Sequence, residues 1–133
     1  MVLQRIAVAL VAVMCLMSAG CATTGSAVRG TWTAVSSAPQ ALVTGSTITI
    51  TFDGSRVTGS SGCNGYGSRS ARVSNGTLIM GETASSAMAC PDPGLMEQEG
   101  RFYALLNARP QIQVDGDTLL LTGQAITMTF RRS

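Results

Sequence analysis

The chain has 133 residues, a formal net charge of +2, nine basic residues that are all arginine, and seven acidic residues. Because it contains no histidine, Ser-His-Asp and Cys-His catalytic arrangements and His-bound zinc sites are excluded. The charges are scattered, with no basic face and no interleaving of aromatic and basic residues, so no nucleic-acid partner is expected.

The N-terminal segment has the layout of a secretory signal peptide. Arg5 is followed by twelve residues, 6–17, without a polar side chain, and then by the small residues 18–20. A helix of that length rises about 18 Å, whereas the hydrocarbon core of a bilayer is about 30 Å thick. The segment is too short to span the hydrocarbon core as a helix, and we expect residues 1–20 to be removed as a signal peptide.

The end of this segment resembles the lipobox of bacterial lipoproteins. Small residues precede Cys21, although Ser18 stands where the motif prefers leucine. The resemblance implies that Cys21 is acylated and anchors the mature chain to a membrane; the alternative is an ordinary secreted protein cleaved near Gly20 or Ala22. By resemblance to enterobacterial sorting rules, Ala22 after the cysteine favours the periplasmic face of the outer membrane, with the inner membrane as the alternative.

The mature chain is predicted to hold one domain. Residues 21–29 are small and polar, as expected for a lipidated tether. Residues 30–133 suffice for one domain with a modest core, contain no internal repeat, and are expected to be monomeric.

Two cysteines remain available for a disulfide. Cys15 would leave with the signal peptide and Cys21 would carry lipid, so Cys63 and Cys90 are left to pair in an oxidising periplasm. Closing this loop contributes about 3.5 kcal/mol in the chain-entropy model. The competing interpretation, a catalytic or redox thiol, lacks a CxxC spacing and an obvious neighbouring cation.

Several segments alternate as half-buried antiparallel strands do. From residue 46 onward Ile48, Ile50 and Phe52 fall on one face, with threonines on the other. Asp-Gly and Asn-Gly pairs mark hairpin turns between successive strands. The expected strands are 46–52, 56–59, 70–73, 77–80, 111–114, 118–122 and 125–130.

One helix interrupts the strands. Asp92 is a candidate N-cap, Pro93 suits the first helical position, and Pro110 ends a run with apolar residues at helical spacing. The sequence therefore predicts a mainly β fold, a small antiparallel β-barrel or roll of seven or eight strands with one inserted helix near residues 93–108 covering an open end.

Three short stretches resemble the META domain, the family of the heat-shock lipoprotein HslJ. They are residues 30–32 (GTW), 57–66 with GCNGY at its end, and 86–91 (SAMACP), the last followed by Glu99 on the helix. The resemblance spans residues 30–131 and implies a β-barrel or roll with one helix. It also implies an envelope lipoprotein or periplasmic protein linked to stress tolerance, without an agreed reaction.

Within this resemblance, four residues stand out as a structural motif: Asn64, Gly65, Met88 and Glu99. Helical spacing places Glu99 on the apolar stripe of the helix. We hypothesise that its carboxylate accepts hydrogen bonds from backbone amides of the Cys63-Asn64 loop; the alternative is a solvated edge residue.

Other motifs favour structural interpretations. The glycine-rich residues 62–67 lack the lysine and spacing of a phosphate-binding loop and predict a tight loop that presents Cys63 to Cys90. Residues 115–117 lack the other ligands of a calcium loop and predict a hairpin turn. The methionines are expected to fill the core rather than bind copper, so no metal or cofactor is predicted; they are Met80, Met88, Met96 and Met128.

The functional expectation is a non-enzymatic, lipid-anchored envelope domain that supports stress tolerance through contacts with an envelope protein. No carboxylate pair, nucleophile with a base, or metal cluster can be assembled from these residues. The alternative is a binding module for a small apolar ligand, such as an acyl chain. A solvent-accessible cavity would favour that alternative if it were lined by Ile48, Ile50, Phe52, Ile126 and Phe130.

Overall fold

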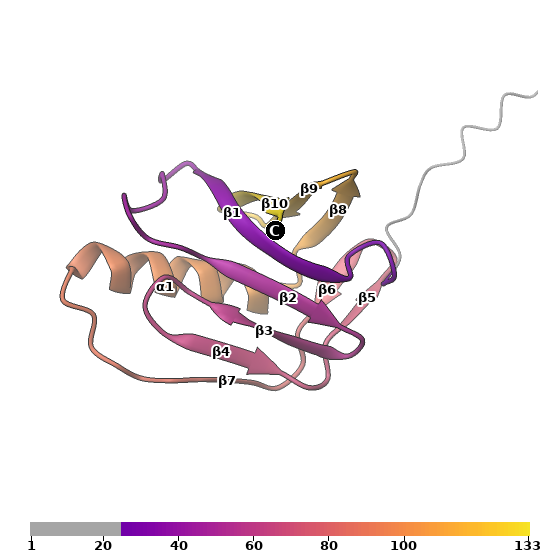
Figure 1. The fold of residues 1–133 in the computed structure, drawn as a ribbon, viewed down its shortest axis with the longest axis horizontal. Coiled ribbons are helices and arrows are strands. Elements are labelled where there is room, and N and C mark those ends of the chain that lie inside the picture. Colours follow the sequence, from indigo (N-terminus) through magenta and orange to yellow (C-terminus); the bar gives the residue numbers. More distant parts are fainter. Residues whose placement is uncertain (1–24) are drawn as a thin grey trace, which may run out of the picture.

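The computed structural model describes residues 25–133, so the predicted signal peptide and the acylated Cys21 lie outside the described residues. Ten strands and one helix, α1 (Pro93–Asn107), make up the domain (Figure 1). The strands are β1 (Gly30–Ala38), β2 (Thr49–Asp53), β3 (Arg56–Ser60), β4 (Gly65–Ser68), β5 (Arg72–Ser74), β6 (Thr77–Ile79), β7 (Thr83–Ser85), β8 (Gln111–Asp115), β9 (Thr118–Thr122) and β10 (Thr127–Arg132).

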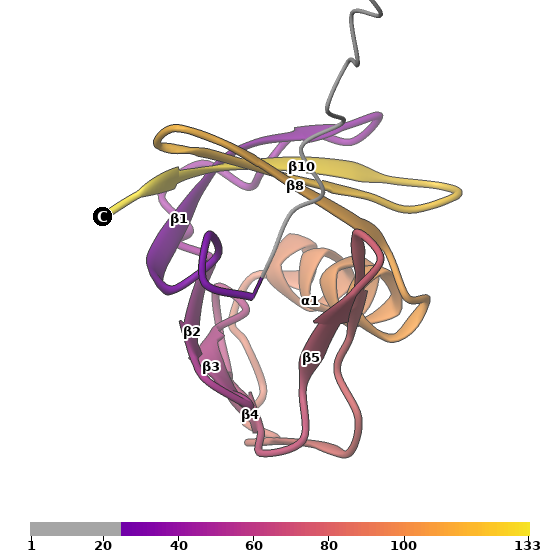
Figure 2. The same ribbon diagram turned by 90° about the vertical axis from the view of Figure 1, so that its right-hand side faces the viewer.

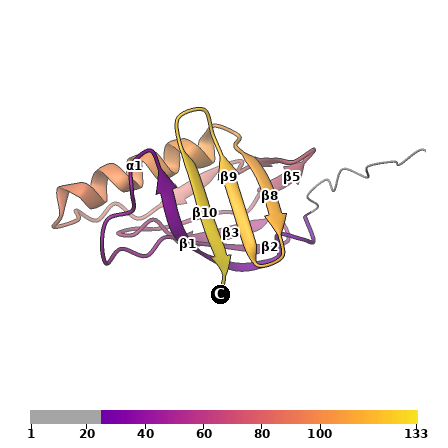
Figure 3. The same cartoon turned by 90° about the horizontal axis from the view of Figure 1, so that it is seen from above.

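All ten strands belong to one antiparallel sheet in the order β5-β6-β8-β9-β10-β1-β2-β3-β4-β7. The sheet curls into a half-barrel with β5 and β7 at its edges, as Figure 2 shows in a view into the curl. In that view β8 and β10 lie across the top, β1 to β4 descend on one side, and α1 lies between the arms. Seen from above, β1, β10, β9 and β8 lie side by side over β2 and β3 (Figure 3). The predicted mainly β fold with one helix is confirmed.

The strands with clear alternation were located well by the sequence. The segment 118–122 is β9 without change, and residues 56–59 and 111–114 each gain one residue at the C-terminal end. The predicted strand 46–52 begins later, at Thr49, because Ile48 forms only an isolated bridge with Ser61.

Three strands, β1, β4 and β7, were not predicted. In β1 an irregularity between Ala34 and Ser36 interrupts the alternation. Glycine stands at both outward positions of β4, so its sequence GYGS shows no polar-apolar alternation. The strand β7 has three residues and pairs only with β4, so its sequence carries too short a pattern to detect.

The helix begins as predicted and ends one residue earlier than predicted. Asp92 caps its N-terminus, where the Asp92 carboxylate accepts a hydrogen bond of 2.8 Å from the Gly94 amide. At the other end Arg109 adopts a left-handed conformation with φ of 51°. The helical region is disfavoured for a residue that precedes proline, and Pro110 therefore ends α1 before Arg109.

The core fills the inside of the curled sheet. The buried apolar side chains form one cluster that joins strands from both arms to α1. Ile48, Ile50 and Phe52 point into it, as their alternation predicted. The members are Val28, Trp32, Ile48, Ile50, Phe52, Val57, Tyr66, Ala71, Leu78, Met80, Phe102, Leu105, Leu106, Ile112, Leu119, Leu121, Met128 and Phe130.

The prediction that all four methionines fill the core is wrong for two of them. Met80 and Met128 are buried, whereas Met88 is 61% exposed and Met96 45% exposed. Met88 lies on an irregular loop and Met96 on the solvent face of α1, positions that the core does not reach. In residues 25–133 no helix has both the length and the apolar character needed to cross a membrane.

Candidate functional site

The motif residues gather where α1 meets the loop between β3 and β4. Ser61, Asn64 and Glu99 are buried there. The Glu99 carboxylate accepts hydrogen bonds from the Asn64 backbone amide at 3.2 Å, from the Asn64 side-chain amide at 3.0 Å, and from the Ser61 hydroxyl. These donors compensate the burial of a charged group.

This geometry bears directly on the hypothesis about Glu99. The expected hydrogen bond from the Asn64 amide is present, and Glu99 is only 8% exposed, so the alternative of a solvated edge residue is wrong. The sequence interpretation missed two of the donors, Ser61 and the Asn64 side chain. Nothing in the local sequence pattern distinguishes Ser61 from its neighbour Ser60, which is only partly buried.

Asn64 also holds the loop that contains Met88. Its side-chain oxygen accepts hydrogen bonds from the Met88 amide at 2.8 Å and from the Ser86 hydroxyl at 3.0 Å. Its side-chain nitrogen donates to the Met88 carbonyl at 3.2 Å as well as to Glu99. The Asn64 side chain therefore links α1 to the loop 86–90, while Met88 takes part through its backbone.

Gly65 and the disulfide complete this connection. The Gly65 amide donates to the Ser86 hydroxyl at 3.2 Å, and the Gly65 carbonyl accepts from the Ser86 amide at 3.0 Å. Cys63 and Cys90 form a disulfide with a Cα–Cα separation of 6.1 Å, within the usual range. The tight loop expected at residues 62–67 is present only up to Asn64, where the Ser61 amide donates to the Asn64 carbonyl at 2.9 Å, because Gly65 begins β4.

A second buried polar side chain, Gln98, lies beside Glu99 on α1 and was not predicted. Its side-chain oxygen accepts a hydrogen bond of 2.7 Å from the Val43 amide, and its nitrogen donates to the Ser46 hydroxyl at 3.0 Å. A Cβ atom on Gly62 would lie 2.8 Å from the Gln98 nitrogen, so the glycine leaves room for this contact. The N-terminal half of α1 is thus attached by polar contacts to two separate loops.

Gly59 on β3 and Tyr66 on β4 lie within the stretch 57–66 that resembles the META domain, and they pair with each other in the sheet. The Tyr66 hydroxyl donates to the Thr49 carbonyl at 2.8 Å, and its ring packs edge-on against Phe102 with 5.4 Å between the ring centroids. Burial raises the pKa of Tyr66. A Cβ atom on Gly59 would lie 2.1 Å from the Thr49 carbonyl oxygen, so this position requires glycine.

Trp32 attaches the start of the described chain to the domain. Its indole nitrogen donates to the Val28 carbonyl at 2.7 Å, and the Arg132 guanidinium lies 4.1 Å from the indole centroid. Arg132 also donates to the Arg29 and Ala27 carbonyls. Contacts with the domain thus begin before Gly30, within the last residues of the predicted tether.

These side chains hold secondary structure together, and their donors and acceptors are already used within the domain. In residues 25–133 no group of three or more Cys, Asp and Glu side chains lies close enough to bind a metal ion. Among the buried side-chain polar atoms of the described chain, the Tyr103 hydroxyl has no hydrogen-bond partner. The arrangement is that of a structural network.

A curled antiparallel sheet with one helix, held by a disulfide and the Asn64–Glu99 contacts, defines a small mainly β half-barrel domain. The family model described as META domain matches residues 26–133, and the chain belongs to the META domain family. The resemblance seen in the sequence is confirmed.

Solved structures share this fold. An NMR structure of a protein from Burkholderia xenovorans aligns with a TM-score of 0.66 and 26% identity, covering 82% of this chain and 86% of that one. A second protein, also determined by NMR, aligns with a TM-score of 0.70 and 23% identity, covering 83% of this chain and 95% of that one. No curated protein sequence matches the chain.

Proposed function

We propose that the chain is a non-enzymatic lipoprotein of the bacterial cell envelope, anchored by acylated Cys21 at the periplasmic face of the outer membrane. Its META domain supports tolerance of envelope stress through contacts with other envelope proteins. The META family assignment and the order of the N-terminal segment, an apolar run followed by small residues and Cys21, both support this proposal.

The observation that carries the proposal is the disulfide between Cys63 and Cys90. Disulfides persist in oxidising compartments and are rare in the cytosol, so a structural disulfide supports export. An exported protein needs a signal peptide, and the N-terminal segment has the layout of one. The protein then reaches the compartment in which Cys21 can be acylated.

The packing of the interior supports protein contacts over an apolar ligand. Ile48, Ile50 and Phe130 are fully buried within the single core cluster. Phe52 lines a hollow of about 30 Å³, far below the range of about 300–1,000 Å³ typical of small-molecule sites. Native mass spectrometry that found lipid copurifying with the folded domain would favour the alternative.

A matched pair of cysteine variants tests the anchor. In cells that express the full chain, radiolabelled palmitate should enter the wild-type protein, and the protein should sediment with membranes. Cys21→Ala should abolish both, because the thiol that accepts the lipid is lost, whereas Cys15→Ala, within the predicted signal peptide, should change neither.

The proposal fails if the wild-type protein stays uncleaved in the cytosol with Cys63 and Cys90 open to alkylation. For the role in stress tolerance, a strain without the chain should lose viability in heat or detergent. Wild type should restore viability, and Cys21→Ala should not.

A further inference from the structure

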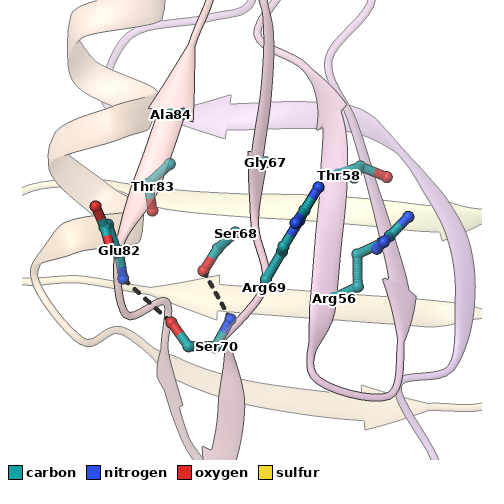
Figure 4. A pocket seen from close by; sticks show the side chains of 9 residues that line it. All are labelled: Arg56, Thr58, Gly67, Ser68, Arg69, Ser70, Glu82, Thr83 and Ala84. Carbon is teal, nitrogen blue, oxygen red and sulfur yellow. Dashed lines mark hydrogen bonds between the residues drawn. The ribbon is translucent and has the colours of Figure 1, made fainter.

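A hollow of about 510 Å³ lies on the outer face of β3, β4 and β7, which we call the β4 groove (Figure 4). Its floor is β4, where Gly65 and Gly67 occupy the outward positions and Tyr66 and Ser68 are buried. A Cβ atom at Gly67 would lie 3.3 Å from the Val57 carbonyl oxygen, so the backbone itself forms the floor. The volume falls in the range of small-molecule sites.

Two arginines lie at neighbouring positions on adjacent strands, on one side of this groove. Val57 on β3 pairs with Ser68 on β4, so Arg56 and Arg69 occupy the next opposed positions. Like charges directly opposite each other in an antiparallel pair destabilise a sheet. Figure 4 shows the Arg69 side chain extending past Gly67 toward β3, on the same side of the groove as Arg56.

The nearby carboxylates do not neutralise this pair. Asp53 pairs with Arg56 in the sheet, but its carboxylate lies 3.2 Å from the Arg29 guanidinium. Glu82 lies on the opposite side of the groove from both arginines (Figure 4). Among the described residues, no ion pair within 4.0 Å joins Arg56 or Arg69 to an acidic side chain.

The chemistry of the groove fits a phosphate group. Guanidinium groups donate paired hydrogen bonds that match phosphate oxygens, and two of them suit a group with several oxygens. Thr58 adds a hydroxyl on the β3 side of the groove. An anion held between the arginines would relieve the repulsion between them.

The position of the groove matches the proposed anchor. Gly25, the first described residue, lines a small hollow together with Gly54 and Ala71. Gly54 is two residues before Arg56, and Ala71 is two residues after Arg69. Gly25 is four positions after Cys21, and an extended chain spans at most about 14 Å over four positions. An acylated Cys21 would therefore keep this end of the domain close to lipid headgroups.

We propose that the β4 groove binds a phosphate ester between Arg56 and Arg69, supplied by the headgroup of a membrane lipid. The phosphate chemistry stands on the groove alone, whereas the membrane source rests on the proposed lipid anchor.

The first arm of the test uses glycerol 3-phosphate as the probe. The full chain is titrated in neutral detergent at about 0.15 M salt, where weak surface attraction is screened, and the Gly67 amide resonance is followed by NMR. Wild type should show a saturable shift. The double variant Arg56→Gln/Arg69→Gln should bind at least about tenfold more weakly, because it loses the charge-assisted hydrogen bonds.

Two further variants complete this arm. Ala84→Leu keeps both charges and fills the groove from exposed β7, so it should also weaken binding. Arg131→Gln removes one exposed charge on β10, outside the groove, and should bind as wild type. The absence of a saturable shift, or equal weakening by Arg131→Gln and the double variant, would overturn the proposal.

The second arm identifies the source of the phosphate. The full chain with Cys21→Ala, which cannot be acylated, is floated with vesicles of phosphatidylcholine with and without phosphatidylglycerol. Binding to the anionic vesicles that is lost in the Arg56→Gln/Arg69→Gln background supports the lipid source. Binding of glycerol 3-phosphate without vesicle binding overturns the lipid source. The palmitate labelling of Cys21 remains a separate test of the anchor.

Discussion

Asn64 and Glu99 are the residues at which the motif loops and the helix meet. The Asn64 side chain uses both its oxygen and its nitrogen, and Glu99 accepts hydrogen bonds from Asn64 and Ser61. Because these groups are buried, loss of one partner leaves another without a hydrogen bond in a place that water does not reach. This cost of leaving buried polar groups unpaired explains why the loop between β3 and β4 depends on the Glu99 carboxylate.

Replacing Glu99 should destabilise the domain without changing its exposed surface. Glu99→Ala removes the buried acceptor that the Asn64 amides and the Ser61 hydroxyl share, so we expect a loss of about 3 kcal/mol. Glu99→Gln keeps one acceptor oxygen, but its side-chain NH₂ group would face the donors of Asn64 and Ser61. The free energy of unfolding should therefore fall by about 2 kcal/mol. For a domain of this size these losses lower Tm by about 8–20 °C in thermal unfolding.

Glu97→Gln is the matched control for these variants. Glu97 lies on the same helix but is exposed, and its contact with Arg101 is a long ion pair of 4.0 Å. Such surface pairs contribute little to stability, so Tm should stay near that of wild type. An unchanged Tm in both Glu99 variants would contradict the structural role of the carboxylate.

At the scale of elements, α1 combines polar attachment in its N-terminal half with apolar packing in its C-terminal half. Gln98 and Glu99 contact the loops, while Phe102, Leu105 and Leu106 enter the core. Gly100 lies between the two halves, is exposed, and has open space where a Cβ atom would be. Its backbone freedom in the unfolded chain therefore opposes helix formation without a compensating contact.

Gly100→Ala should accordingly stabilise the domain by about 1 kcal/mol, because alanine favours the helix and meets no neighbour. Tm should rise by about 4–8 °C. Gly116→Ala also enters open space, but at a φ of 58°, and should instead lower Tm. A fall in Tm for Gly100→Ala would show that the helix is strained at this point.

At the scale of the whole molecule, the curled sheet brings together segments that are distant in sequence. β1 pairs with β10 on one side and with β2 on the other, so the N-terminal and C-terminal strands are neighbours. The disulfide then joins the loop after β3 to the segment before α1. Without it, that segment would be held chiefly by the hydrogen bonds of Asn64.

Removing the disulfide should therefore lower the stability of the whole domain. Cys63→Ser/Cys90→Ser should lose about 3.5 kcal/mol, since the unfolded chain gains the freedom of the opened loop. Tm should fall by about 15–25 °C. Reductant should cause a similar fall in wild type and none in the double variant. A wild-type Tm that is insensitive to reductant would contradict this.

Local patterns located most of the elements. Alternation gave β9 without change, and Asp92 with Pro93 located the start of α1. The glycines of β4 hid its alternation, and the three residues of β7 carry too short a pattern. The burial of Glu99 followed from its place on the apolar stripe of α1, whereas Ser61 had no such signal.

The sequence alone determined the mainly β class and the start of the helix, because these depend on neighbours along the chain. Only the tertiary structure decided that Asn64 links α1 to the loop 86–90, that Met88 is exposed, and that Arg56 and Arg69 lie next to each other on one side of the β4 groove. Those facts depend on strand register and on the curl of the sheet. Both are set by how the core packs across distant segments, a property that no local window of sequence contains.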